Sequence, residues 1–449
     1  MRKASGGGRI AAGLAGMLLA CGTAMPLHAE DLTEIFNASR QSDPKYRAAR
    51  YEFEAASFVE PQTRAALLPS ISAEYLRTRT DQNILSSNNA VFASGRSRYT
   101  TESQTMSLTQ PIFKLSAWRG YQQAKVKVKQ AAAVFSAAEQ DLMLRVATAY
   151  LNALAARDAL GFAGAEREAI KRQLDLVQQR FSSGLVAIAN LHDARARFAV
   201  KEADVVAARN DLDDKLQALR EITGRTYDRL KPLRDTIMLD QPEPNNMDHW
   251  VEGALKQNLL LEARRLAVEI AQQEIGRQQA GHYPSADLVV TQNRKDTGGS
   301  LFGGGSNVET GDVMLRLNIP LYSGGLVSAL SGEAIKRYEG AREDLERDAR
   351  QTERQTRAAF QGVTGGVTRV QALAQGVVSA ESARELKVEG YKSGLETILQ
   401  VLDAERDLYA AKRDSARARY DFLLNRLRLK QAVGTLSEAD LDAVNRMLE

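Results

Sequence analysis

Two stretches of this chain share one pattern: residues 181–198 read FSSGLVAIANLHDARARF, and residues 391–408 read YKSGLETILQVLDAERDL. At an offset of 210 positions the identical pairs are Ser183/Ser393, Gly184/Gly394, Leu185/Leu395, Ile188/Ile398, Asp193/Asp403 and Ala194/Ala404. SLTQPIF (107–113) also matches RLNIPLY (316–322), and LLPS (67–70) matches HYPS (282–285), at nearly the same spacing. Because the three matches keep their order along the chain, we interpret them as an internal duplication.

The duplication divides the chain into two repeats of one plan. We expect the first repeat to cover residues 30–230 and the second to cover residues 248–449. The stretch 231–247, which begins KPLRDTIMLDQPEPNN, contains three prolines and is expected to link them.

Residues 1–29 predict a secretory signal peptide. Three basic residues and an uncharged run over 10–22 precede a polar boundary after Ala29, where we expect cleavage. The segment has no acidic residue, so its removal lowers the formal net charge from +4 to +1. A charge so close to neutral gives no argument for nucleic-acid binding. In the alternative, a lipoprotein, cleavage before Cys21 would leave this single cysteine acylated.

Long helices are predicted in both repeats. No proline occurs between Ser116 and Phe181, or between Val327 and Tyr391. About 65 residues at 1.5 Å each would extend roughly 100 Å if the helix were unbroken. Apolar residues recur every three to four positions and alanine is frequent, as in closely packed helices. A composition with only 6% aromatic residues and 10 prolines agrees with this interpretation.

Each repeat also contains two segments in which apolar and polar residues alternate, as they do in strands with one apolar face. These segments cover 71–75, 106–109, 287–291 and 313–319. Val289 breaks the alternation in the third of them. The stretches 83–95 and 297–307 are rich in Gly, Ser and Asn and predict exposed loops.

Four such strands cannot be stable alone, because their edges and their apolar face would stay open. The mean hydropathy is −0.34, and no apolar stretch reaches the ~18–20 residues that a membrane-spanning helix needs. In an exported protein, strands from several copies can close into an outer-membrane barrel. We therefore expect a mainly α-helical homotrimer with a transmembrane β-barrel, to which each subunit contributes four strands.

The chain resembles the TolC-family outer-membrane efflux proteins from about Leu32 to Leu448. The segments that carry the resemblance are LLPSISAEY (67–75), LTQPIFKLSAWRG (108–120), RFSSGLVAIANLHDARARF (180–198), LREITG (219–224), LNIPLYSGG (317–325), YKSGLETILQVLDAERDLYAAKRD (391–414) and GTLSEADL (434–441). It implies a homotrimer with a twelve-stranded barrel in the outer membrane and a long helical barrel in the periplasm. It also implies the exit duct of a tripartite export system, whose partners are a periplasmic adaptor (a membrane fusion protein) and an inner-membrane ABC transporter or RND-type pump.

The resemblance gives the two SGL turns a role at the periplasmic tip, where the adaptor docks. The turn residues are Ser183, Gly184, Leu185, Ser393, Gly394 and Leu395. Each turn follows a long predicted helix and precedes a shorter one, so its glycine fits the left-handed position that ends a helix. The plainer interpretation, that both turns are helix caps and nothing more, stays open.

The resemblance also implies a pore constriction at Asp403, which lies in the family's LxxVLDA pattern. Three copies of this carboxylate would attract cations. Gln400 stands where the family has a second aspartate, and the two side chains, nearly one turn apart, are expected to point the same way. We expect weaker cation selectivity than two acidic rings would give. Asp403 on a solvated helix face is the alternative. Ala189, Asn190 and Glu396 also depart from the polar lock of some members.

No catalytic or metal-binding pattern is found in the sequence. The histidines are His28, His192, His249 and His282, and none has the spacing of a zinc site. We expect no enzyme activity and no cofactor, with the energy for transport supplied by partners. The alternatives are a periplasmic coiled-coil structural or adaptor protein and, without residue support, a secreted hydrolase. The sequence does not specify the cargo, and both proteins and small toxic compounds fit the resemblance.

Overall fold

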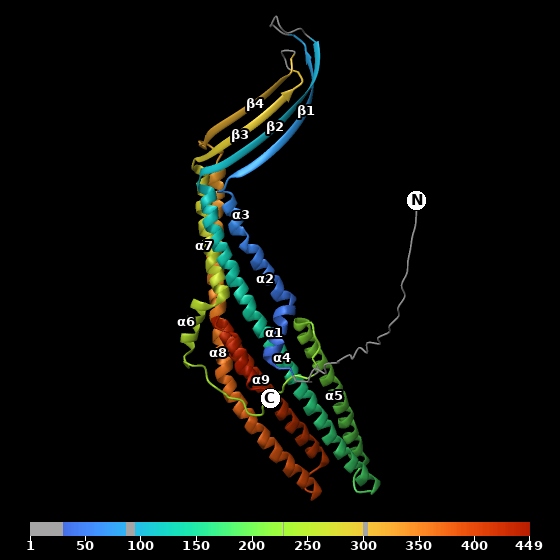
Figure 1. Ribbon diagram of the computed structural model, residues 1–449. Helices are drawn as coiled ribbons and strands as arrows, with labels where there is room; N and C mark the ends of the chain where they lie inside the picture. The colour runs from blue at the N-terminus through green and yellow to red at the C-terminus, as the bar shows by residue number, and fades with distance from the viewer. Residues whose placement is uncertain (1–29, 87–94, 228, 300–303) are drawn as a thin grey trace, which may run out of the picture.

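The computed structural model describes residues 30–86, 95–227, 229–299 and 304–449. Its elements in chain order are α1 (Leu32–Ser42), α2 (Pro44–Ser57), α3 (Val59–Ala65), β1 (Ser70–Ile84), β2 (Gly95–Lys114), α4 (Leu115–Ser182), α5 (Ile188–Thr223), α6 (Met247–Gln257), α7 (Leu259–Gln279), η1 (Ala280–His282), β3 (Ser285–Thr297), β4 (Ser306–Asn318), α8 (Leu326–Lys392), α9 (Ile398–Val433) and α10 (Glu438–Asn445). Figure 1 shows an elongated molecule with the sheet at one end and two helix pairs, α4–α5 and α8–α9, at the other. The expected signal peptide, residues 1–29, lies outside the described residues.

The two longest helices are unbroken, as the lack of proline predicted. Helix α4 has 68 residues and α8 has 67, so each extends about 100 Å. Each is followed by an SGL turn and a helix of 36 residues, α5 or α9. The order of elements therefore repeats the same plan twice. Within the described part of the chain, no helix has an apolar stretch long enough to cross a membrane.

The four strands form one antiparallel sheet in the order β1-β2-β3-β4. Its register aligns Ile71, Leu108, Val290 and Val313 in one row across the strands. The next row is Ser72, Ser107, Thr291 and Asp312. Because successive strand residues point to opposite sides, one face of the sheet is apolar and the other is polar. The predicted alternation is confirmed, and Val289, which broke it, lies on the polar face, where it is buried.

The strands extend farther than the alternation predicted. The expected loop 83–95 begins inside β1 and ends inside β2, and the expected loop 297–307 begins in β3 and ends in β4. The parts of these loops at 87–94 and 300–303 lie outside the described residues. The loop bounds agree with the strand ends to within two residues, but the alternation marked only the halves of the strands nearest the helices, because the far halves carry polar residues on both faces. Alternation therefore disappears there, although backbone pairing continues.

A core in the middle of the molecule joins α1, α4, α9 and α10 with the segment between the repeats. Tyr150 of α4 is fully buried, and its hydroxyl donates to the backbone oxygens of Lys231 (3.0 Å) and Glu30 (3.3 Å). Leu233 pairs with Leu448 through a backbone bridge. These contacts hold the inter-repeat segment and both ends of the described chain against α4.

Candidate functional site

The two SGL turns end the long helices with the same backbone geometry. Gly184 (φ +73°) and Gly394 (φ +80°) adopt the left-handed conformation that favours glycine. The Gly184 amide donates to the Phe181 carbonyl, and the Leu185 amide to the Arg180 carbonyl, both at 2.9 Å. The same two hydrogen bonds recur in the second turn. Both turns are Schellman caps, so the predicted helix-ending glycines are confirmed.

Each turn presents one leucine to the outside. Leu185 is 73% exposed and Leu395 is 85% exposed. The hydroxyls of Ser183 and Ser393 each donate to the carbonyl four residues earlier, at 3.1 and 3.0 Å, and so help to close the helix ends. The backbone amides of both turns donate within the helix ends, and the two leucines stand out as exposed apolar groups.

The helices that follow the turns begin differently. Helix α5 starts after Ala187 without a side-chain cap, whereas α9 starts with a capping box. There the side-chain oxygen of Gln400, Oε1, accepts from the Thr397 backbone amide at 2.7 Å. The Gln400 side chain therefore turns back to the start of α9, where backbone amides lack helical partners. Gln400 and Asp403 have different partners, although they lie nearly one turn apart.

Asp403 forms an ion pair that the sequence analysis did not identify. Its carboxylate lies 2.7 Å from the Arg197 guanidinium of α5 and 3.5 Å from that of Arg406. The Asp403 side chain is 41% exposed, so it is neither buried nor fully solvated. No local signal in the sequence pointed to this partner, because Arg197 lies 206 positions before Asp403. The pair joins the second helices of the two repeats.

A buried glutamate ties the same two helices to α4. Glu166 is 1% exposed and lies 2.9 Å from Lys201 of α5 and 3.0 Å from Arg413 of α9. Burial opposes the charge of Lys201, but the hydrogen bonds to Glu166 and Asp204 outweigh it and raise the pKa of the lysine. One carboxylate thus holds two cations from two different helices.

Apolar side chains from both repeats meet just above the turns. The buried members are Ile170, Val177, Leu191, Ala194, Tyr391, Ile398, Val401 and Leu402. The guanidinium of Arg180 stacks over the Tyr391 ring at 4.5 Å from its centre. The two helix pairs of one protomer therefore share a single small core at this end of the molecule.

The three residues that differ from the polar lock of some family members have other contacts here. Glu396 pairs with Lys387 at 2.7 Å, within the second turn region. Ala189 is exposed, and Asn190 uses its backbone amide to bond the Ala187 carbonyl at 3.1 Å. No described side chain bonds Asn190. The contact between the repeats at this level therefore rests on Asp403 and the small core rather than on these three residues.

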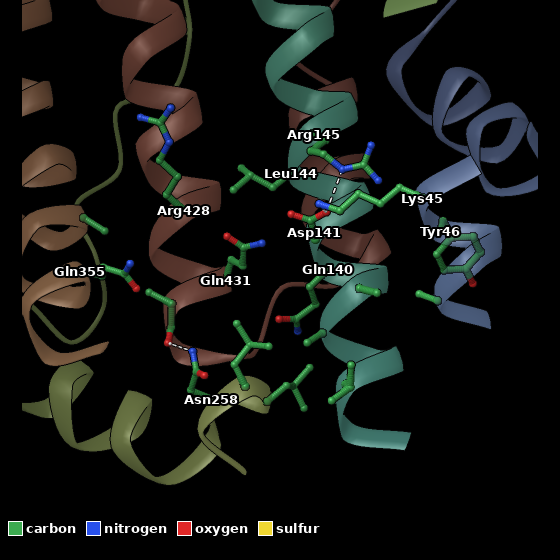
Figure 2. A pocket seen from close by; sticks show the side chains of 18 of the residues that line it. Lys45, Tyr46, Gln140, Asp141, Leu144, Arg145, Asn258, Gln355, Arg428 and Gln431 are labelled. Carbon is green, nitrogen blue, oxygen red and sulfur yellow. Dashed lines mark hydrogen bonds and ion pairs between the residues drawn. The ribbon is translucent and has the colours of Figure 1, made fainter. Parts of the chain in front are cut away.

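A cavity of about 780 Å³ opens in the middle of the molecule, between α2, α4, α8, α9 and the start of α7 (Figure 2). Several of its polar groups are already paired: Asp141 lies 2.8 Å from both Lys45 and Arg145. Gln140 donates to the carbonyl of Gly434 at 2.8 Å. Among the residues described, no group of His, Cys, Asp or Glu is placed to hold a metal ion. The cavity offers no arrangement that suggests catalysis.

Comparison with known proteins decides the family. The model of the outer membrane efflux protein family matches residues 35–225 and 250–435, one match in each repeat. The chain belongs to this family. It is 36% identical to outer membrane protein TolC of Escherichia coli K12, over 94% of this chain and 85% of TolC. It is 28% identical to the alkaline protease secretion protein AprF of Pseudomonas aeruginosa, over 92% and 86% of the two chains.

The fold agrees with solved structures of such channels. The outer membrane protein VceC of Vibrio cholerae superimposes with a TM-score of 0.77 at 21% identity, over 90% of this chain and 96% of VceC. The resemblance identified from sequence is therefore confirmed. This efflux protein is an outer-membrane exit channel whose helices form a large periplasmic portion. A periplasmic structural or adaptor protein, the alternative from sequence, is not favoured. The relatives are channels rather than enzymes.

Proposed function

We propose that three copies of this chain form the exit duct of a tripartite export system. The observation that carries the proposal is the sheet, whose outer strands β1 and β4 each have one unpaired edge within the protomer. Its apolar face is also open: Val313, Leu315 and Leu317 are 74%, 71% and 61% exposed. Closure with strands of neighbouring copies pairs the edges and turns the apolar face to lipid.

The helical part supports the same assembly. In Figure 1, α5 and α8 form the two outer edges of the helix pairs. Exposed apolar side chains lie on both helices, with Val206 of α5 at 60% and Leu386 of α8 at 73%. A neighbouring copy that packs α8 against α5 covers these residues. The trimer that results has one continuous wall from the sheet to the turns.

The periplasmic end is the docking site of the adaptor in this proposal. The turn residues 183–185 and 393–395 present Leu185 and Leu395 on a rigid, fully capped backbone. An adaptor helix with an apolar tip fits such a surface. The inner-membrane partner is an ABC transporter or an RND-type pump, and the cargo is proteins, small toxic compounds or both.

The same end contains the constriction. Three Asp403 carboxylates attract cations to the pore, but Arg197 partly neutralises each of them. Gln400 adds no charge, and its side chain is engaged by the start of α9. The duct is therefore expected to prefer cations weakly.

The docking proposal is tested by replacing both turn leucines, Leu185→Asp with Leu395→Asp, in cells that carry no other copy of the channel. Export is expected to fall by on the order of tenfold or more, because charges replace the apolar contact. The purified variant should still conduct ions in a lipid bilayer. The matched control is Met238→Asp, which changes a residue that is 67% exposed but lies between the repeats, away from the turns. Unchanged export in the double variant contradicts docking at the turns.

A further inference from the structure

The apolar face of the sheet ends at a defined row of residues. On β4 the side chains on this face run from Leu317 through Leu315 and Val313 to Glu309. These positions span nine residues, within the ~9–11 residues that a tilted strand needs to cross the membrane. In the same row as Glu309 lies Arg294, the first cation on this face. The boundary between hydrocarbon and lipid headgroups therefore falls at this row.

Four arginines lie on the same face beyond that boundary. Arg77 and Arg79 belong to β1, and Arg96 and Arg98 belong to β2. The register places them on the side of Ile71, because they occupy the alternate positions that continue its row pattern. The β1–β2 hairpin projects farther from the helices than β3–β4 (Figure 1). Arg77, Arg96 and Arg98 are 65%, 62% and 56% exposed at their side chains.

The acidic residues on this part of the face do not balance the arginines. Asp81 accepts from Arg96 at 2.7 Å and from Arg98 at 2.9 Å. Glu102 lies 3.3 Å from Arg77. Arg79 is exposed and shares no hydrogen bond or ion pair with the residues that the structure describes, although its charge also acts on Asp81. Four cations against two anions leave each copy with a positive excess on β1–β2.

The neighbouring strands differ in sign. On the same face, β3 and β4 carry Arg294 with Asp296 and Glu309, so anions exceed cations there. Lys295 lies on the opposite face. The positive excess is therefore confined to a patch of Arg77, Arg79, Arg96 and Arg98, which we call the headgroup patch.

We propose that the headgroup patch binds the phosphate groups of lipids in the outer leaflet of the outer membrane. The patch continues the lipid-facing apolar band outward, at the level where headgroups lie. Arginine presents a planar fork of donors that matches phosphate oxygens, and basic residues at this level attract anionic lipids. A lipid phosphate is the occupant because its acyl chains lie along the apolar band directly below. This inference rests on the outer-membrane location of the family and not on docking at the periplasmic turns.

The test measures lipid binding by the purified full chain in detergent. The probe is a diphosphorylated diglucosamine lipid, compared with the same lipid after both phosphates are removed, and bound lipid is counted by native mass spectrometry. The double variant Arg79→Gln with Arg98→Gln is expected to bind the phosphorylated lipid about twenty-five-fold more weakly, at roughly five-fold per arginine. The matched control, Lys295→Gln with Arg316→Gln, removes two cations from the opposite face.

Two further measurements separate the possible outcomes. Arg79→Lys with Arg98→Lys keeps the charge and is expected to retain most of the binding, which excludes misfolding as the cause of a loss. A large excess of inorganic phosphate is expected to leave the lipid bound. Equal binding of the phosphorylated and dephosphorylated lipids overturns the proposal. An equal loss in the opposite-face control, or displacement by inorganic phosphate, overturns it as well.

Discussion

Helices α5 and α9 occupy the same place in the two repeats, yet they differ in burial. Both have 36 residues and both follow an SGL turn. Fourteen residues of α9 are buried, whereas only Leu191, Ala194, Leu219 and Thr223 of α5 are. Helix α9 packs against both α4 and α8, while α5 packs mainly against α4. One protomer therefore buries α9 by itself and leaves most of α5 uncovered, as the proposed trimer requires.

The largest expected effect is on the free energy of unfolding, when a buried side chain of α9 is truncated rather than an exposed one of α5. Leu423→Ala in α9 removes a side chain that is 0% exposed, so we expect the protomer to lose about 3 kcal/mol of unfolding free energy. Val206→Ala in α5 removes a smaller side chain that is 60% exposed in the protomer and is covered only by the neighbouring copy of the proposed trimer, so it should cost less, about 1 kcal/mol. Urea-induced loss of helical circular dichroism, measured on both variants in detergent, compares them. Equal losses contradict the difference in burial.

The next effect concerns the carboxylate that holds both helices. Glu166→Gln leaves Lys201 and Arg413 without their shared anion, and we expect a loss of about 2 kcal/mol. The loss stays below that of a deeply buried pair because the arginine reaches solvent. Glu168→Gln is the matched control on α4: this side chain is 47% exposed and, among the described residues, pairs only with the neighbouring Arg167, so its loss should cost little. If both variants unfold at the same urea concentration, the Glu166 carboxylate does not stabilise the packing of α5 and α9 on α4.

The upper half of α4 is fixed in another way, through α7. Glu274 accepts hydrogen bonds from Arg277 and from Gln123 of α4. These bonds lower the pKa of Glu274 to about 2, although its partial burial alone would raise it. Because the folded-state pKa lies below the ordinary 4.5, the stabilisation is complete above that value and is lost as the pH falls toward 2. We expect Glu274→Gln to cost roughly 1–2 kcal/mol at pH 7. Urea unfolding at neutral and acid pH should show the cost vanishing near pH 2; a cost that persists there contradicts the assignment.

The smallest effect is electrical, at the ion pair between α5 and α9. Arg197→Gln frees the Asp403 carboxylate and should increase cation preference in single-channel recordings, while Asp403→Ala should reduce it. Reversal potentials in a salt gradient measure both changes. Arg195→Gln, an exposed residue on the same helix, serves as the control. If neither Arg197 nor Asp403 alters selectivity, the carboxylate is a solvated helix-face group.

Much of the fold could be predicted because the deciding residues act locally. The glycines of the SGL turns fix helix ends wherever they occur, and the alternation around Ile71 and Val313 fixes strand faces. The repeat then predicted a long helix, a turn and a shorter helix in both halves of the chain. The far halves of the strands escaped prediction because arginines such as Arg77 and Arg98 interrupt the alternation there.

The site was less predictable because it depends on contacts between distant elements. Asp403 was identified from its motif, but Arg197 lies 206 positions away, and no local pattern says that α5 meets α9 there. Gln400 was interpreted by the charge it lacks, whereas its observed contact is with Thr397 at the start of α9. Near the start of a helix, a side chain can bond the unpaired backbone amides of the first turn. Helical spacing alone therefore does not show where that side chain points.

The exposed α5 and the open edges of the sheet lead to one proposal: neighbouring copies of the chain pair these edges and cover this helix. The most direct measurement is the native mass of the protein after extraction from the outer membrane in mild detergent. Our account predicts a complex of three chains that requires detergent for its release. A monomer or dimer, or a protein that stays in solution without detergent, contradicts it.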